Sequence, residues 1–271
     1  MTASTIDRVS LFEQLSSGLS LVTGNSRLAR VLADQYSQWR INRGDRQWRS
    51  PAILPWEAWL DKLWEEASLQ GIKGTGRAVP GARQLVSLWQ SVLCADTHAQ
   101  QLLRPESLAA CLRDTRRLAV DWRLDLRHAC WFGDDNENHG AFRQWNLAFE
   151  TLCERQNWIA PEDRSALLCR AVHRLNPASA AGTGFLGFDE FNPAQQELLS
   201  ALSEAGHRVL TMAITPANSH ARLWKSRDSK EELRHMARWV RYWFEKEPGS
   251  RIAVVVPDLQ SRRTEIERNL A

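Results

Sequence analysis

Two adjacent carboxylates, Asp189 and Glu190, are the residues of this 271-residue chain best placed to do chemistry. They directly follow a mostly apolar run of strand character, residues 184–188, and an amphipathic helix begins after them at Pro193. At the end of a buried parallel strand, an aspartate can hold Mg²⁺ through water while a glutamate positions a water molecule for attack on a phosphate. The pair therefore predicts phosphate chemistry, provided that the chain also supplies a phosphate-binding loop.

The start of the chain has the strand, small-residue loop and helix in which such a loop belongs. A brief strand at residues 20–23 leads into a turn, and a helix follows as far as Arg40. A phosphate-binding loop requires Gly-x-x-x-x-Gly-Lys-[Ser/Thr], whose lysine contacts the phosphates and whose hydroxyl binds Mg²⁺. The turn has one glycine, and no lysine occurs before Lys62. We therefore predict a degenerate, inactive cofactor loop made of Gly24, Asn25, Ser26 and Arg27.

Helix capping is the alternative role for the acidic pair. Asp189 can cap the helix that begins near Pro193, with Glu190 exposed beside it. Because the phosphate loop is degenerate, we expect this capping role in preference to Mg²⁺ binding. We accordingly predict no metal site, no ATP or Mg²⁺ cofactor and no confident catalytic residue.

Charge and aromatic content bear on nucleic-acid binding. Arginine outnumbers lysine thirty to five, which suits phosphate recognition but is also what a GC-rich genome produces, and the net charge is only +3. Tryptophan can stack on bases, although most of the thirteen tryptophans are expected in the core. A basic run at residues 113–117 could contact a nucleic-acid backbone or form a solvated helix face. The candidate nucleic-acid contacts are Arg116, Arg117, Trp56 and Trp59.

Cysteine usage and hydropathy indicate the compartment. The five cysteines are dispersed without a Cys-x-x-Cys pair, which predicts reduced, mostly buried thiols. No run of eighteen apolar residues occurs, and the N-terminus lacks the apolar core of a signal peptide. We therefore expect a cytoplasmic protein with no membrane partner.

The order of predicted elements divides the chain into four stretches. Strand-loop-helix units fill residues 1–65 and 181–216, while residues 66–180 are almost wholly helical. A new α/β unit occupies residues 217–271, with strands at 221–225 and 251–257 and helices at 229–247 and 262–270. Its apolar run Ile252-Ala253-Val254-Val255-Val256 is typical of a buried parallel strand. Because this unit stops abruptly, we expect the chain to be a truncated fragment of a longer protein.

This combination resembles superfamily I helicases of the UvrD/Rep type. Asp189-Glu190-Phe191-Asn192, followed by Gln195, is similar to that family's Asp-Glu-Phe-Gln motif, which is the Walker B element of these P-loop NTPases. The chain looks closer still to the AddB-like inactivated helicases of bacterial DNA repair helicase-nucleases. The stretches that carry this likeness are residues 21–29, residues 56–60 and Glu231-Glu232-Leu233 leading into residues 251–257.

The resemblance implies a P-loop NTPase fold with a RecA-like parallel sheet. Residues 1–65 and 181–216 would form the first RecA-like domain, residues 66–180 a large helical insertion, and residues 217–271 the start of a second RecA-like domain. Alignment with the family's phosphate loop places Leu28 at the lysine and Ala29 at the Mg²⁺-binding threonine. Residues 215–218 stand where the family's third motif, Gly-Asp-x-x-Gln, is expected. The resemblance therefore implies an inactivated ATPase with Asp189 and Glu190 as a degenerate Walker B pair.

The function implied is that of a non-catalytic helicase-like module in DNA repair. It would bind single-stranded DNA or a duplex end, a partner helicase-nuclease subunit, or both, and a nuclease domain would lie downstream of Ala271. Two alternatives remain open. The chain could be a residual ATP-dependent helicase that uses Arg27 or Arg30 in place of the missing lysine, or a scaffold for protein interaction alone.

Overall fold

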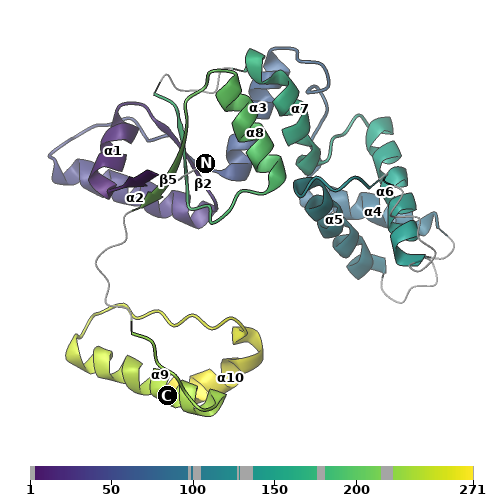
Figure 1. The fold of residues 1–271 in the computed structure, drawn as a ribbon. Coiled ribbons are helices and arrows are strands. Elements are labelled where there is room, and N and C mark those ends of the chain that lie inside the picture. The colour runs from purple at the N-terminus through teal and green to yellow at the C-terminus, as the bar shows by residue number, and fades with distance from the viewer. Residues whose placement is uncertain are drawn as a thin grey trace. The chain divides into compact units, whose positions relative to one another are not determined.

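The structure, a computed structural model, describes residues 4–96, 99, 105–126, 128, 137–175, 181–214 and 222–270. The chain falls into two units, Met1–Thr215 and Pro216–Ala271, a division one residue before the expected boundary. Figure 1 shows both units, and each is considered by itself below. Within the described residues, no helix is long and apolar enough to cross a membrane.

A five-stranded, all-parallel sheet lies at the centre of the described part of the first unit, which confirms the α/β class. Its β2 strand pairs directly with β4, so that Thr23 lies opposite Leu186. The edge strand β1 was not predicted; it joins the sheet by pairing with β5. In spatial order the strands are β1 (Ser4–Ile6), β5 (Val209–Ile214), β4 (Thr183–Leu186), β2 (Ser20–Thr23) and β3 (Ile53–Pro55).

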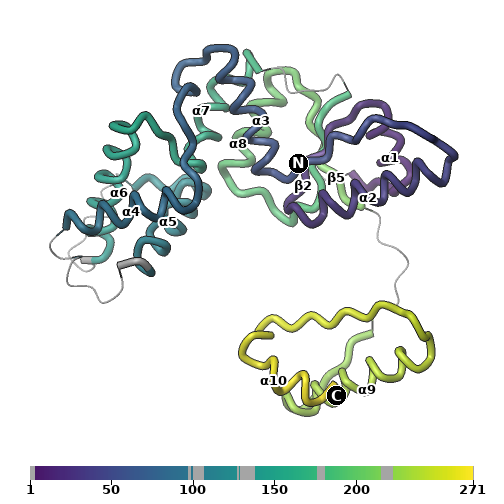
Figure 2. Tube along the Cα trace, turned by 180° about the vertical axis from the view of Figure 1, so that it is seen from behind, coloured from purple at the N-terminus to yellow at the C-terminus, as the bar shows by residue number. Residues whose placement is uncertain are grey.

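Helices cover both faces of this sheet because successive strand residues point to opposite sides. Leu21 and Leu186 face the core that contains the buried side chains of α1 and α2, whereas Val22 and Phe185 face the core built by α3, α7 and α8. Figures 1 and 2 show this group of helices from opposite sides. Their bounds are α1 (Arg8–Ser16), α2 (Ser26–Asn42), α3 (Trp56–Leu69), α7 (Arg164–Ala171) and α8 (Pro193–Glu204).

Three further helices of the first unit have a core of their own, within the stretch predicted to be helical. They are α4 (Ala82–Cys94), α5 (Pro105–Asp121) and α6 (Glu137–Arg155). The fully buried Trp89 stacks on Phe149, with ring centroids 4.4 Å apart and planes 6° apart. The helix expected at residues 161–175 is broken into the turn η3 (Pro161–Asp163), α7 and the turn η4 (Val172–Arg174), and α7 belongs to the layer on the sheet. The helical stretch therefore divides between two cores.

The described part of the second unit contains α9 (Ser229–Lys246) and α10 (Leu259–Leu270) and no strand. The predicted strands at residues 221–225 and 251–257 are therefore wrong as far as the structure describes them. A buried parallel strand needs a neighbouring strand and covering helices, and here Val255 is 89% exposed. Only Leu233 on α9 and Ile266 on α10 are buried among the described apolar residues of this unit.

The cysteines only partly match the prediction of buried thiols. Cys153 is buried and Cys169 half-buried, and burial raises the pKa of both thiols to about 11. Cys94 and Cys111 are exposed, so the prediction is wrong for these two, and Cys130 lies outside the described residues. Both exposed cysteines lie on helices whose buried positions are filled by other residues, including Leu85, Leu88, Trp89, Val92 and Leu93 on α4, and Ala109 and Leu112 on α5.

We expect Trp89→Ala to destabilise the helical part of the first unit by about 3–5 kcal/mol, because it removes a fully buried ring and its stacking partner's contacts. Trp122→Ala is the matched control, since this tryptophan is 54% exposed and should change stability by less than about 0.5 kcal/mol. Urea unfolding followed by circular dichroism measures both. Equal midpoints for the two variants would contradict the assignment of Trp89 to this core.

Candidate functional site

The two candidate loops leave the sheet side by side. Because β2 and β4 are neighbouring parallel strands in register, their C-terminal ends meet at one edge, where ligands bind in open α/β sheets. The amide of Gly24 donates a hydrogen bond of 3.2 Å to the carbonyl oxygen of Leu186. The structure thus brings the loop of residues 24–27 next to the loop that holds Asp189 and Glu190.

Close packing fills the space between these loops. A Cβ atom added to Gly24 would collide with the backbone carbonyl oxygen of Gly187, so only glycine fits there. Gly187 has a φ of +76°, and a Cβ atom at that position would collide with the side chain of Leu28. Leu28, which the helicase alignment places at the position of the phosphate-binding lysine, therefore packs its apolar side chain over the end of β4.

The first turn of α2 is capped by the chain itself. Asn25 accepts a hydrogen bond of 2.9 Å from the amide of Leu28 through Oδ1, and its carbonyl oxygen accepts one of 3.3 Å from the amide of Ala29. The buried Thr23 hydroxyl also donates to the Asn25 carbonyl, at 2.9 Å. Phosphate-binding loops keep such helix N-terminal amides for the ligand, whereas here Asn25 occupies the amide of Leu28.

The acidic pair is exposed, and neither carboxylate forms a hydrogen bond or ion pair with any residue in the described part of the chain. The prediction that Asp189 caps the next helix is wrong. Asn192 caps α8, accepting 2.8 Å from the amide of Gln195, while Gln195 Oε1 accepts 3.0 Å from the amide of Asn192. An Asn before Pro193 with a Gln three residues later is a capping-box pattern that could have revealed this.

Aromatic rings on both sides of the acidic pair anchor its loop. Phe188 and Phe191 stack with centroids 4.7 Å apart, and Phe188 also lies 6.0 Å from the ring of Trp56. Trp56 and Trp59 are only 8% and 5% exposed, within the core between the sheet and α3. The prediction that these two tryptophans stack on nucleic acid does not fit their burial.

Arg116 is buried at 3% exposure, which makes its predicted role in nucleic-acid contact wrong. Its guanidinium donates to Asn146 Oδ1 at 2.9 Å, to Glu162 at 2.5 Å and to Asp163 at 2.8 Å. Burial alone would lower the pKa of Arg116, but the charges of Asp163 and Glu162 outweigh it and raise the pKa. Burial raises the pKa of Asp163, against the opposing effect of Arg116. This cluster holds η3 against α5 and α6.

Arg117 is accessible, but acidic neighbours compensate its charge. Its guanidinium lies 3.1 Å from Glu57 and 3.7 Å from Asp121 in ion pairs, and its side chain is 61% exposed. Burial raises the pKa of Asp121, with Arg117 acting in the opposite direction. The basic run of α5 thus presents much less positive charge than its sequence suggests.

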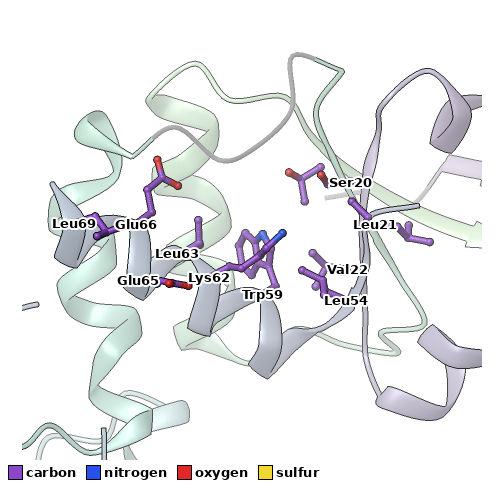
Figure 3. A pocket seen from close by; sticks show the side chains of 12 residues that line it. Ser20, Leu21, Val22, Leu54, Trp59, Lys62, Leu63, Glu65, Glu66 and Leu69 are labelled. Atoms are coloured by element: carbon purple, nitrogen blue, oxygen red, sulfur yellow. The ribbon is translucent and has the colours of Figure 1, made fainter. Parts of the chain in front are cut away.

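Two cavities have linings that do not include the carboxylates of the acidic pair. One of about 230 Å³ lies at the opposite end of the sheet, where Ser20 and Thr183 begin β2 and β4, and α3 lines it with Trp59, Lys62 and Leu63 (Figure 3). The other, of about 380 Å³, lies between α3, α5 and the start of α8. Neither is lined by Asp189, Glu190 or residues 24–27.

Metal ligands and relatives add no further assignment. No group of three or more His, Cys, Asp or Glu side chains that could hold a metal ion occurs in the part of the chain that the structure describes. Residues 215–218, expected in place of the third helicase motif, lie outside the described residues.

Comparison with known protein families gives no match, and neither does comparison with curated proteins.

We expect Gly24→Ala to destabilise the first unit by about 1–3 kcal/mol, because its methyl group would press on the backbone of Gly187. Gly76→Ala is the control, since a Cβ atom there meets nothing within 4 Å and should cost nothing or stabilise slightly. Urea midpoints compare the two. If Gly24→Ala were as stable as Gly76→Ala, the two loops would not be packed together in solution.

Arg116→Ala should destabilise the first unit by about 3–5 kcal/mol, because it leaves the buried side of Glu162 and Asp163 without a cation. Arg117→Ala removes the same charge from the next residue and should cost less than about 1 kcal/mol, since that ion pair is exposed. Thermal unfolding of the two variants tests the difference. A larger loss for Arg117→Ala would reverse these roles.

Proposed function

We propose that this chain is a helicase-like module that has lost ATP hydrolysis and acts as a binding scaffold in DNA repair. The observation that carries the proposal is the packing of Leu28 over Gly187, at the position where a P-loop would hold phosphate. Such a module resembles the AddB-like class of inactivated superfamily I helicases. In that interpretation the sheet of the first unit is a RecA-like domain.

The arrangement retained by the fold supports a helicase ancestry. A strand-loop-helix unit, β2 to α2, lies directly beside the strand that ends in the acidic pair, and all strands are parallel. Asp189 and Glu190 emerge at the carboxyl edge of the sheet, exposed to solvent. This is the edge at which open α/β sheets bind their ligands.

The groups that would bind and hydrolyse ATP are missing or occupied. Leu28 offers no charge to phosphate, and Ala29, which is 7% exposed, offers no hydroxyl to Mg²⁺. The helix-terminal amide of Leu28 is bonded to Asn25. Arg27 and Arg30 are both exposed, and neither has a hydrogen bond or ion pair with a described residue that would hold it in the place of the lysine. These features favour a scaffold over a residual ATPase.

The partner in this proposal comes from the resemblance. AddB-like proteins act on DNA together with a helicase-nuclease subunit, and the net charge of +3 is compatible with binding a polyanion. A scaffold for protein interaction alone is the second candidate, favoured by the internal ion pairing of α5, which leaves the first unit without its predicted basic face.

Calorimetric titration with Mg-ATP tests the loss of the ATP site. We expect no binding heat at millimolar nucleotide, and the same result for Glu190→Gln, because the phosphate-binding groups are absent rather than the carboxylates. Mg²⁺-dependent binding, or turnover that Glu190→Gln abolishes, would overturn the proposal in favour of a residual ATPase.

The DNA arm is measured separately, by fluorescence anisotropy of labelled single-stranded and blunt duplex oligonucleotides. Binding to DNA should weaken steeply as salt increases, because it releases counterions. No binding to either oligonucleotide would leave a protein partner as the remaining role.

A further inference from the structure

Helix α9 of the second unit carries a stripe of exposed cationic side chains. The stripe consists of Lys230, Arg234, Arg238 and Arg241, all of them exposed. None of the four forms an ion pair or a side-chain hydrogen bond with any residue that the structure describes. Free cations on one surface are the feature that attracts a polyanion.

Helical geometry places the four side chains on one face. Lys230, Arg234 and Arg238 are four residues apart, and Arg241 follows at the next turn, so at 100° per residue all four fall within about a quarter of the helix circumference. From the first to the last, the stripe extends about 17 Å along the axis. Two carboxylates lie on or beside this face: Glu245 at its C-terminal end, and Glu231 at its N-terminal end, where it accepts a hydrogen bond from the amide of Arg227.

The stripe differs from the basic run of α5, whose arginines are paired with acidic residues. On α5, Arg113 is paired with Asp114, Arg116 with Glu162 and Asp163, and Arg117 with Glu57 and Asp121. In the second unit, the described ion pairs are formed by arginines of α10 and not by those of the stripe. Arg262 pairs with Asp258 and with Glu232, and Arg263 with Glu267. The four cations of the stripe therefore remain exposed to solvent.

Exposed aromatic rings border the stripe. Tyr242 is 54% exposed one turn after Arg238, and Phe244 is 64% exposed three residues after Arg241, so both rings lie toward the C-terminal end of the stripe. Lys246 lies over the rings of Tyr242 and Trp243, at 5.5 Å and 4.9 Å. Aromatic faces next to a cationic track stack the unpaired bases of a single strand, whereas a duplex keeps its bases inside.

We infer that this face of α9, which we name the α9 stripe, binds single-stranded nucleic acid, with the arginines on the phosphates and Tyr242 and Phe244 against the bases. The inference rests on the proposed function, in which the chain is a DNA-binding module, and it moves the contact surface from the predicted residues of the first unit to the second unit. The length of the stripe suits several consecutive phosphates.

Anisotropy with a fluorescein-labelled single-stranded oligothymidine tests the α9 stripe in the complete chain. Arg234→Ala/Arg238→Ala/Arg241→Ala should weaken binding about tenfold or more and reduce the slope of log affinity against log salt by about two, since each phosphate contact contributes about 0.7 on single strands. The charge-matched control Arg46→Ala/Arg49→Ala/Arg155→Ala removes three exposed cations from the first unit and should stay within about twofold of the parent.

Two further variants separate the contribution of positive charge from that of the aromatic ring. The triple Arg→Lys variant at residues 234, 238 and 241 keeps the charge and should bind within about threefold of the parent, because lysine still contacts phosphate as a point charge. Tyr242→Ala should weaken single-strand binding about tenfold with little effect on a duplex of equal length.

The outcomes distinguish this inference from the proposed function. The α9 stripe is overturned if the Arg→Ala stripe variant binds the oligonucleotide as tightly as the parent protein. It is also overturned if the charge-matched control loses as much affinity as the stripe variant. In both cases the proposed function stands. No parent binding to the oligonucleotide overturns the stripe and removes the DNA arm of the proposal. Mg-ATP binding overturns the proposed scaffold role whatever the DNA result.

Discussion

The edge-to-face contact between Phe185 and Trp59 connects the sheet of the first unit to its helical layer. The ring centroids are 5.2 Å apart and the ring planes 85° apart, the favourable geometry for aromatic pairs. Phe185 lies on β4, two residues before Gly187, where the chain leaves the sheet with a φ of +76°. Through Trp56 the aromatic packing continues to Phe188, which keeps the acidic pair at the sheet edge.

Buried arginines do the corresponding work for the helical part of this unit. Arg164, 3% exposed, reaches Glu57 and Asp61 of α3 and also donates to the Pro161 carbonyl oxygen at 3.0 Å. Together with Arg116 it ties the turn η3 to helices on either side. An arginine can do this because its planar fork forms several charge-assisted hydrogen bonds at once. The arginine-rich composition is therefore partly a structural feature of the interior.

Local patterns in the sequence predicted the first unit well. The strand at residues 20–23 was placed with its observed bounds, and α2, α3 and α8 begin within one residue of their expected starts, because strong apolar periodicity and clear turns mark them. Strand β1 was missed, since three residues before Asp7 carry no periodic signal and owe their strand conformation to pairing with β5. Its partner is more than two hundred residues away in the sequence.

Properties that depend on distant partners could not be read from local pattern. Arg116 looked like part of a basic surface, and only the approach of residues 46 positions later shows that it is buried. Trp56 was likewise indistinguishable from a stacking platform before β4 was placed against it. The strand predicted at residues 251–257 failed for the converse reason, because apolar β-branched residues form a strand only when another strand lies beside them. The cap at Asn192, by contrast, could have been predicted from the sequence, because Asn192, Pro193 and Gln195 form a capping-box pattern.

The short edges of the sheet have a consequence for how the protein behaves at high concentration. Both edge strands, β1 and β3, are three residues long, and β3 ends in Pro55, which has no amide hydrogen to offer. Such edges give a stray strand little backbone to pair with. The extended, exposed valines 254–255 in the second unit have no such protection. The short edges therefore limit backbone pairing between copies of the first unit.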